Sequence, residues 1–326
     1  MNLQSIATHN RTQLLFLSVA VLFGVGFVAI KAGLAFIPPL LFVAFRLDVA
    51  AILLLAYVVL RTDYWRPRTR RDVMGIVAGG AFLIFGSLAL LFVGLQQTTS
   101  GVAAIIFSLD PVLAVALAAV LLPDERFSRL GLLGVVVALV GVAIVVQPSP
   151  GHFLSGNLQG EEYVLLGATS LALGGVLVRL SKHEMDETAL TAWSIAVAAP
   201  AMHLTSLGVG ESVASVDPTP TALAALVYVG VFMTAVAYPI YFSLIERIGV
   251  TRTSFVQYLV PVVASVVGWL VLGERLPPEA FVGYFVIFLG FLLLNSDEVE
   301  NVVGRFRPAT EPGDGTDEPD ATARTR

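Results

Sequence analysis

The sequence has no cysteine and few charged residues for its length. Without cysteine the chain cannot contain a disulfide framework, a thiolate zinc site or a cysteine nucleophile. Charged residues make up 13% of the 326 residues, about half the share of roughly 25% found in soluble domains. Lysine is scarcer than arginine, a composition typical of salt-adapted organisms and of GC-rich genomes. The scarcity of charge excludes an ordinary soluble protein.

Apolar residues take the place of the missing charges. They make up 56% of the chain, and the mean hydropathy is +0.84. They fall in blocks of about 20 residues, the length that crosses about 30 Å of hydrocarbon. We therefore expect an all-α membrane protein with ten transmembrane helices, at about residues 14–35, 39–60, 73–94, 99–121, 129–147, 162–180, 189–208, 221–245, 252–272 and 279–295.

Basic residues divide the loops into two alternating sets. The loop between the second and third segments is the richest, with Arg61, Arg66, Arg68, Arg70 and Arg71. The intervening loops have almost no basic residues, and Arg275 is their exception. Because cytoplasmic loops retain basic residues, we predict a multi-pass protein of the plasma membrane with both termini in the cytoplasm. Topology is the simplest role for the five arginines, and binding of anionic lipid is the alternative. Nothing in the chain indicates binding of nucleic acid.

Two stretches half a chain apart have the same pattern. Residues 111–127 read PVLAVALAAVLLPDERF and residues 261–276 read PVVASVVGWLVLGERL, so each begins at a proline and closes with Glu-Arg. Other positions also match, at an offset of 148 or 149 residues: Lys31 with Arg179, Gly26 with Gly174, Gly134 with Gly283, and Gly141 with Gly290. Each repeat contains five helices, which is an odd number. The second copy would therefore enter the membrane from the opposite face.

The repeat predicts how the chain is divided. We expect a cytoplasmic N-terminus (1–13), a first five-helix repeat (14–147), an extracellular linker (148–161), a second five-helix repeat (162–295) and an acidic, disordered cytoplasmic tail (296–326). Inverted repeats are characteristic of carriers that alternate access around a central site.

These features together resemble the EamA-type permeases of the drug/metabolite transporter superfamily. The resemblance covers about residues 14–295 and includes Phe23-Gly24, Lys31, Phe45-Arg46 and Tyr241-Phe242. Two departures are Pro123-Asp124, where the second half has Gly273, and Phe23, where the family often has tryptophan. The resemblance implies a ten-helix carrier for small metabolites, often an exporter of amino acids or drug-like compounds.

The paired prolines are the first candidate functional residues. A proline within a helix removes one backbone hydrogen bond and clashes with the carbonyl four residues earlier. Pro111 and Pro261 should thereby free the carbonyls of Phe107 and Gln257. We predict that these prolines are hinges that bend two helices around a central cavity, and a packing kink is the alternative.

Charged residues within the apolar segments are the second group. Asp110 should lie near the middle of the bilayer, where it suits proton coupling or contact with a substrate amine. Arg46 could pair with Asp110 or bind a substrate carboxylate. Lys31 is a weaker candidate, since it lies near a helix end and could extend to the interface. Neither Asp110 nor Arg46 is repeated in the other half, where Val260 and Ser194 occupy the matching positions.

Polar and aromatic residues complete the predicted cavity: Gln257, Tyr258, Tyr238 and Trp193. Packing or anchoring at the interface is the alternative for each aromatic residue. For His203 we expect a packed position, because its own helix offers no metal-ligand partner. The Glu-Arg pairs at 125–126 and 274–275 could act as gates or merely mark helix ends. The glycines at a spacing of seven should permit close contact between helices.

The leading hypothesis is a secondary active transporter of small molecules. No ATP-binding motif is present, so transport would depend on substrate exchange or on a gradient of protons or another ion. We expect no cofactor and no metal, and the oligomeric state stays open. An intramembrane enzyme is the rival, but the sequence lacks His-Glu-x-x-His and Gly-x-Ser-x-Gly motifs. A receptor or structural membrane protein is the other alternative, and neither rival class predicts a five-plus-five repeat.

Overall fold

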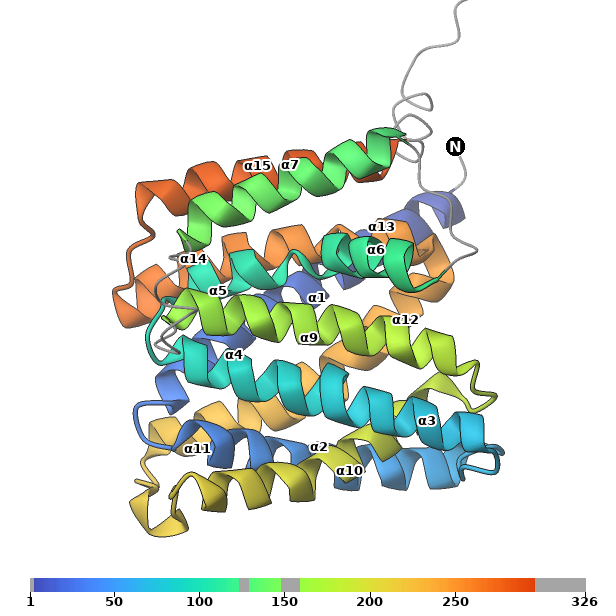
Figure 1. Ribbon diagram of the computed structural model, residues 1–326, viewed down its shortest axis with the longest axis vertical. Helices are drawn as coiled ribbons and strands as arrows, with labels where there is room; N and C mark the ends of the chain where they lie inside the picture. The colour runs from blue at the N-terminus through green and yellow to red at the C-terminus, as the bar shows by residue number, and fades with distance from the viewer. Residues whose placement is uncertain (1–2, 123–128, 148–158, 297–326) are drawn as a thin grey trace, which may run out of the picture.

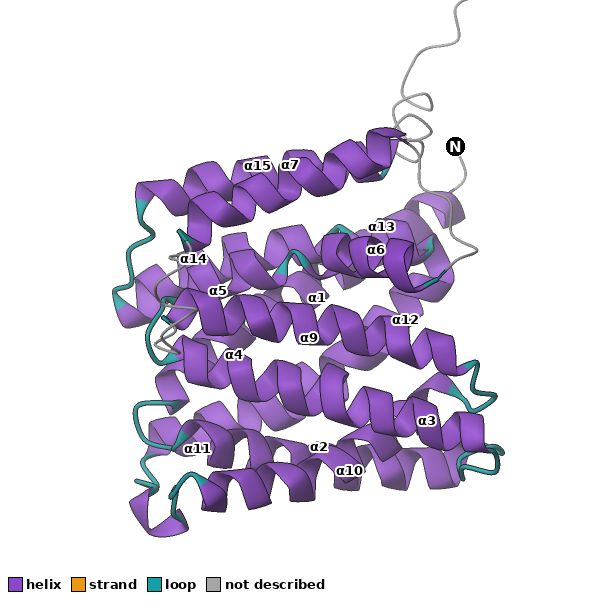
Figure 2. Cartoon of the chain, in the orientation of Figure 1, coloured by secondary structure: helices purple, strands orange, loops and turns teal. Residues whose placement is uncertain are grey.

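The computed structural model describes residues 3–122, 129–147 and 159–296, and within these ranges the chain is helical, with no strand (Figure 2). The predicted tail, most of the predicted linker and the pair Glu125-Arg126 lie outside the described residues.

The helices follow the chain in the order that the apolar segments predict. In the first half they are α1 (Leu3–Gly33), α2 (Pro39–Arg61), α3 (Arg70–Ala78), η1 (Gly79–Gly86), α4 (Ser87–Leu95), α5 (Ser100–Phe107), α6 (Asp110–Leu121) and α7 (Arg129–Val146). In the second half they are α9 (Gly160–Ser181), α10 (Glu187–Gly208), η2 (Val213–Ser215), α11 (Pro220–Val227), η3 (Tyr228–Val236), α12 (Ala237–Ile248), α13 (Val250–Ser254), α14 (Val256–Leu272) and α15 (Pro278–Leu294).

Seven helical segments in the described chain are long and apolar enough to cross a membrane, and three shorter apolar helices accompany them. The shorter ones are Leu130–Val146, Pro220–Thr234 and Pro278–Leu294. The long helices run roughly side by side, so that their ends form two opposite faces of the molecule (Figure 1). This arrangement confirms the expectation of an all-α, multi-pass membrane protein.

We name the two ends of the bundle the Glu274 face and the Asp72 face, each after a carboxylate that lies there. The Glu274 face contains the loops at 34–38, 96–99, 209–219 and 273–277. The Asp72 face contains the loops at 62–69 and 182–186 and the turn at Gly249 (Figure 1). The sequence predicts that the Glu274 face is extracellular.

Helices of the first half pack mainly on helices of the second half, in matched pairs. Helix α1 packs against α14 and against α11, η3 and α12, while α9 packs against α5 and α6 and against α3, η1 and α4. The pairs α2–α10 and α7–α15 complete the set. The core of the bundle therefore lies between the two halves, around α1 and α9.

Two segments, η1 and η3, are π-helical, with a wider turn than the α-helices on either side. Gly79 and Tyr228, which begin them, are 149 residues apart, the same offset that relates the repeated glycines. Each segment lies against a matched glycine of the opposite half: Leu83 of η1 against Gly174, and Met233 of η3 against Gly26. The absence of a Cβ at these glycines lets each wide turn approach its neighbour closely.

The pair α7–α15 lies at one edge of the molecule (Figure 1) and is held by glycine contacts. A Cβ on Gly134 would lie 2.5 Å from the carbonyl oxygen of Gly290. A Cβ on Gly283 would lie 2.7 Å from the carbonyl oxygen of Gly141. The predicted role of these four glycines in close helix contact is confirmed.

The fourth apolar segment is broken into α5 and α6, as Pro111 predicts. Ser108 and Leu109 have ψ angles of −8° and −14°, so the regular α-helix stops after Phe107 and resumes at Asp110. Pro111 then lies in the first turn of α6, where its missing N–H costs nothing.

The ninth segment is also interrupted, before its proline. A turn at Phe255, with φ −60° and ψ −21°, separates α13 from α14, and Pro261 lies inside α14. The two prolines are therefore related in sequence, while the two breaks fall at different distances from them.

Candidate functional site

The helix break places Asp110 deep within the bundle. It lies ten residues after Ser100, the first residue of α5, and therefore about 15 Å along the helix from the Glu274 face. The side chain is partly exposed, and no cation among the described residues pairs with it. A carboxyl group without a partner at this depth is available to a proton or to a positively charged group of a ligand.

Tyr258 of α14 contributes a hydroxyl beside this carboxyl. Its side chain is only 3% exposed, and its hydroxyl oxygen has no hydrogen-bond partner in the described part of the chain. Asp110 is the carboxylate that acts on it electrostatically. Since a buried hydroxyl without a partner costs free energy, Tyr258 is well placed to bind a ligand or a water molecule.

The ring of Tyr258 is fixed by aromatic contacts with α15. Its centroid lies 4.2 Å from that of Phe291 and 5.5 Å from that of Phe288. The hydroxyl of Tyr284 donates a hydrogen bond to the backbone carbonyl of Tyr258. These contacts hold the unpaired hydroxyl in place without using it.

Gln257 precedes Tyr258 and is partly exposed. No hydrogen bond of its side-chain amide is described, so the amide can both donate to and accept from a ligand. Aromatic rings from three other helices lie in the same core, in the pairs Phe23–Tyr241 and Phe27–Phe107. The centre of the bundle thus combines the carboxyl group of Asp110, the hydroxyl group of Tyr258, the amide of Gln257 and several ring faces.

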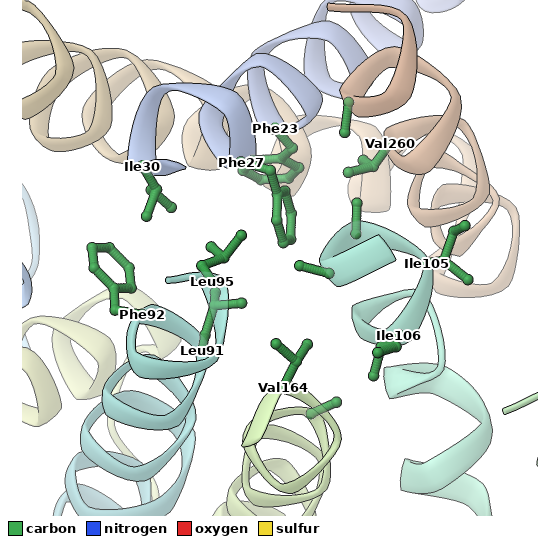
Figure 3. Close-up of a cluster of buried hydrophobic side chains, with 14 of the residues drawn as sticks. Phe23, Phe27, Ile30, Leu91, Phe92, Leu95, Ile105, Ile106, Val164 and Val260 are labelled. Carbon is green, nitrogen blue, oxygen red and sulfur yellow. The ribbon is translucent and has the colours of Figure 1, made fainter. Parts of the chain in front are cut away.

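Apolar side chains fill the core around α1, α4, α5, α9 and α14 (Figure 3). They are buried, most of them almost completely: Phe23, Phe27, Ile30, Leu91, Phe92, Leu95, Ile105, Ile106, Val164 and Val260. We call this group the apolar plug. Ile30, Leu95 and Val164 lie near the helix ends at the Glu274 face, whereas Phe23 and Val260 lie deeper, so the plug extends from that face into the core.

Hydrogen bonds between distant loops join the helix ends at the Glu274 face. Glu274 accepts hydrogen bonds from the backbone N–H and the hydroxyl of Ser100, at the start of α5. Glu211 accepts from the backbone N–H groups of Leu40 and Leu41, at distances of 3.2 and 2.8 Å. Carboxylates at helix N-termini are favoured by the unpaired N–H groups and the helix dipole. These bonds tie the first turns of α2 and α5 to the loops that follow α10 and α14.

Lys31 belongs to the same set of bonds. Its Nζ donates to the carbonyl oxygens of Leu95, at 2.6 Å, and Gln96, at 3.2 Å, which end α4. A cation at a helix C-terminus is stabilised by the carbonyls that have no helical partner. Contact of Lys31 with substrate remains a prediction.

Three other predicted site residues, Arg46, Trp193 and Tyr238, lie on α2, α10 and α12. Arg46 is 5% exposed on α2, which packs on α10 and η3. Trp193 of α10 lies toward the Asp72 face, where its indole Nε1 donates to the carbonyl oxygen of Trp65, 2.7 Å away. It belongs to a second, smaller apolar cluster. The side chain of Tyr238 is outside the described part of the chain.

A pair of titratable residues went unrecognised in the sequence. His203 Nε2 of α10 lies 2.8 Å from Asp48 Oδ2 of α2, and its ring contacts Phe45. Both side chains are partly exposed. The residues are 155 positions apart, so no local spacing could have predicted the pair. Among the described residues no group of three His, Cys, Asp or Glu side chains could hold a metal ion.

The helical bundle defines a multi-pass membrane protein. The chain belongs to the EamA-like transporter family, which it matches over residues 10–147 and again over residues 158–296. The resemblance found in the sequence is thereby confirmed, and the chain is a membrane transporter of small molecules.

Individual relatives are similar over most of their length. The chain is 31% identical to a probable terminal-alkyne amino-acid exporter of Streptantibioticus cattleyicolor over 76% of this chain and 80% of the relative. It is 27% identical to a probable amino-acid metabolite efflux pump of Salmonella typhimurium, over 86% and 93% of the two chains. A protein of known crystal structure, at 18% identity, has the same fold, with a TM-score of 0.60 over 92% of this chain and 99% of the other.

Proposed function

We propose that this transporter exports small metabolites with an amino group, by alternating access to a site at Asp110. The observation that carries the proposal is the carboxyl of Asp110, which pairs with no cation of the described chain, in the same core as the buried Tyr258 hydroxyl, which has no hydrogen-bond partner there. A carboxyl group attracts an ammonium group, and the nearby ring faces favour a cation as well. The amino-acid exporters named among the relatives agree with this substrate class.

The mechanism that we propose uses two inverted five-helix repeats, 14–147 and 162–295, with ten spans and both termini in the cytoplasm. The matched packing of α1 and α9, and the offset of 149 residues between η1 and η3, support the repeat. The breaks near Pro111 and Pro261 would serve as hinges. Because no ATP-binding motif is present, an ion gradient or substrate exchange would drive transport.

The difference in burial between α5 and α6 supports access of the substrate from the Asp72 face. Residues Ser100 to Ile106 of α5 are all buried, next to the Glu274 face. In α6, by contrast, Asp110, Pro111 and residues 114–117 are partly exposed, so this helix is less tightly enclosed by protein than α5. We propose that the substrate enters from this side, and that opening of the Glu274 bonds and the apolar plug releases it.

Transport by the purified protein in proteoliposomes tests the proposal. We expect Asp110→Asn to lower the exchange of amino-acid substrates at least about tenfold, which corresponds to the loss of one charge-assisted contact of about 1.4 kcal/mol or more. Asp48→Asn is the matched control, because it removes another carboxylate of the spans, one paired with His203. Wild-type exchange rates in Asp110→Asn would disprove the assignment of the site.

Proton coupling through Asp110 is a separate part of the same hypothesis. We expect a pH gradient to drive uptake by the wild-type protein and to have no effect on any residual uptake by Asp110→Asn. Gradient-driven uptake that survives the substitution would exclude Asp110 as the coupling group.

A further inference from the structure

The loop between α2 and α3 has the densest positive charge in the described chain. Within residues 61–71, which we call the arginine loop, five arginines are exposed: Arg61, Arg66, Arg68, Arg70 and Arg71. Asp63 is the one acidic residue of the loop. Among residues 3–122, 129–147 and 159–296, none of these arginines forms an ion pair, so their charge is available to a partner.

Asp72 follows the loop, but its charge is already used inside the protein. Its side chain is completely buried. Its two oxygens accept hydrogen bonds from the backbone N–H groups of Arg68, Thr69 and Glu184 and from the hydroxyl of Tyr64. Because Glu184 lies between α9 and α10, Asp72 joins loops of the two halves, and its own charge is satisfied by these donors rather than by an arginine.

Tyr64 is the first of two anchored rings that each position an arginine. Its hydroxyl donates to Asp72 Oδ2 at 2.7 Å, which fixes the ring. The guanidinium carbon of Arg68 lies 4.6 Å from the ring centroid. A guanidinium group over an aromatic face is stabilised by the ring electrons and loses conformational freedom.

Trp65 is the second anchored ring. It stacks on Trp193 of α10, with centroids 6.3 Å apart and planes 6° from parallel, and its carbonyl accepts the indole hydrogen bond of Trp193. The guanidinium carbon of Arg66 lies 4.5 Å from the Trp65 centroid. Arg66 and Arg68 are thus held on neighbouring rings at the same end of the bundle.

The position of the loop indicates the partner. Arg61 ends one candidate span and Arg70 begins the next, so the loop meets the membrane at the level of the lipid headgroups. Tyrosine and tryptophan are typical of this level. Guanidinium groups bind phosphate through two parallel hydrogen bonds, and anionic lipids attract basic segments.

We propose that the arginine loop binds the headgroup phosphate of anionic phospholipids in the adjoining leaflet, with Arg66 and Arg68 as the specific ligands. A lipid bound there rests on Tyr64 and Trp65, whose anchors are Asp72 and Trp193. Binding therefore strengthens the connection between the arginine loop and α10, and stabilises the folded protein.

The experiment uses the full chain in nanodiscs of neutral phosphatidylcholine, with and without phosphatidylglycerol. Thermal unfolding gives the stabilisation by anionic lipid, and titration of the phosphatidylglycerol fraction gives an apparent affinity. Two double variants are compared with the wild type. Arg66→Gln with Arg68→Gln removes the two ring-bound arginines, whereas Arg70→Gln with Arg71→Gln removes two charges from the same loop away from the rings.

We expect phosphatidylglycerol to raise the melting temperature of the wild-type protein. The Arg66/Arg68 variant should bind this lipid about 25-fold more weakly, about fivefold for each arginine. The Arg70/Arg71 variant should retain most of the affinity, and inorganic phosphate added to neutral nanodiscs should have no effect. Equal losses in both variants would show attraction by diffuse charge and overturn the proposal. If inorganic phosphate raised the melting temperature as much as phosphatidylglycerol does, the assignment to lipid would be overturned. A melting temperature of the wild-type protein that does not change with phosphatidylglycerol would overturn it as well.

Discussion

The carboxylate of Glu274 caps the helix that begins at Ser100, 174 residues earlier in the chain. It accepts hydrogen bonds from the backbone N–H, at 3.0 Å, and from the hydroxyl of Ser100. Ser100 begins α5, the helix that leads to Asp110, and Glu274 follows α14, the helix that contains Tyr258. One contact at the Glu274 face therefore joins the two helices that form the candidate site.

Removal of this cap should loosen the Glu274 face. A lost helix cap costs about 1 kcal/mol, which shifts an equilibrium between closed and open states about fivefold. The chain has no native cysteine, so Ile105→Cys would place a single thiol in the apolar plug. We expect Glu274→Gln to increase labelling of this thiol by a membrane-impermeant reagent about fivefold. Arg275→Gln is the control, and equal labelling in both backgrounds would mean that the cap does not restrain the face.

A second prediction concerns the glycines between α7 and α15. Gly290→Ala should destabilise the protein by about 1–3 kcal/mol, the usual cost of overpacking, because the new Cβ would lie 2.6 Å from the carbonyl oxygen of Gly134. Gly175→Ala is the matched control, since nothing lies within 4 Å of a Cβ at that position of α9. Thermal unfolding in detergent compares the two variants. Equal stabilities would contradict the close packing of this pair.

The sequence predicted the features that depend on composition and on local chemistry. Blocks of apolar residues identified the helices, Pro111 predicted the break before α6, and the glycine spacing predicted the contact of α7 with α15. Asp110 could be recognised because an isolated carboxyl within an apolar segment needs an explanation.

The features that the sequence did not predict depend on contacts between distant helices. Asp48 and His203 lie on α2 and α10, and each looks isolated within its own segment. The π-helical turns have no side-chain signature, since their residues are as apolar as those of the flanking helices. The turn at Phe255 precedes Pro261 by six residues, and no residue of the segment marks its position in the sequence.

Gly174 and Gly26 occupy equivalent positions of the repeat, but substitution by alanine should destabilise the protein to different extents. A Cβ on Gly174 would clash with the backbone nitrogen of Leu83 in η1. A Cβ on Gly26 would meet the Sδ atom of Met233 at 2.6 Å, and a methionine side chain can move aside. We expect Gly174→Ala to cost about 1–3 kcal/mol and Gly26→Ala clearly less. Melting temperatures of the two variants in the same detergent test this order. A larger loss of stability in Gly26→Ala would show that η1 accommodates a new Cβ more readily than η3.

The last prediction concerns alkaline pH and the hydrogen bond that anchors Tyr64. Donation to the carboxylate of Asp72 raises the pKa of the Tyr64 phenol above its usual value, because the bond stabilises the protonated form. A group whose pKa is raised by folding stabilises the protein below its unfolded pKa, which is about 10 for tyrosine. This stabilisation is lost as the pH rises through the higher folded pKa. We therefore expect the wild-type protein to lose more stability than Tyr64→Phe between about pH 9 and pH 11.

Thermal unfolding across this pH range measures the difference, with Tyr57→Phe as the control. Tyr57 is 55% exposed on α2, and no hydrogen bond of its hydroxyl is described. At neutral pH Tyr64→Phe should already be less stable than the wild type, since Asp72 loses one of its four donors. The two stability curves should converge at high pH, because deprotonated Tyr64 can no longer donate to Asp72. Parallel curves would show that Tyr64 does not control the alkaline loss of stability.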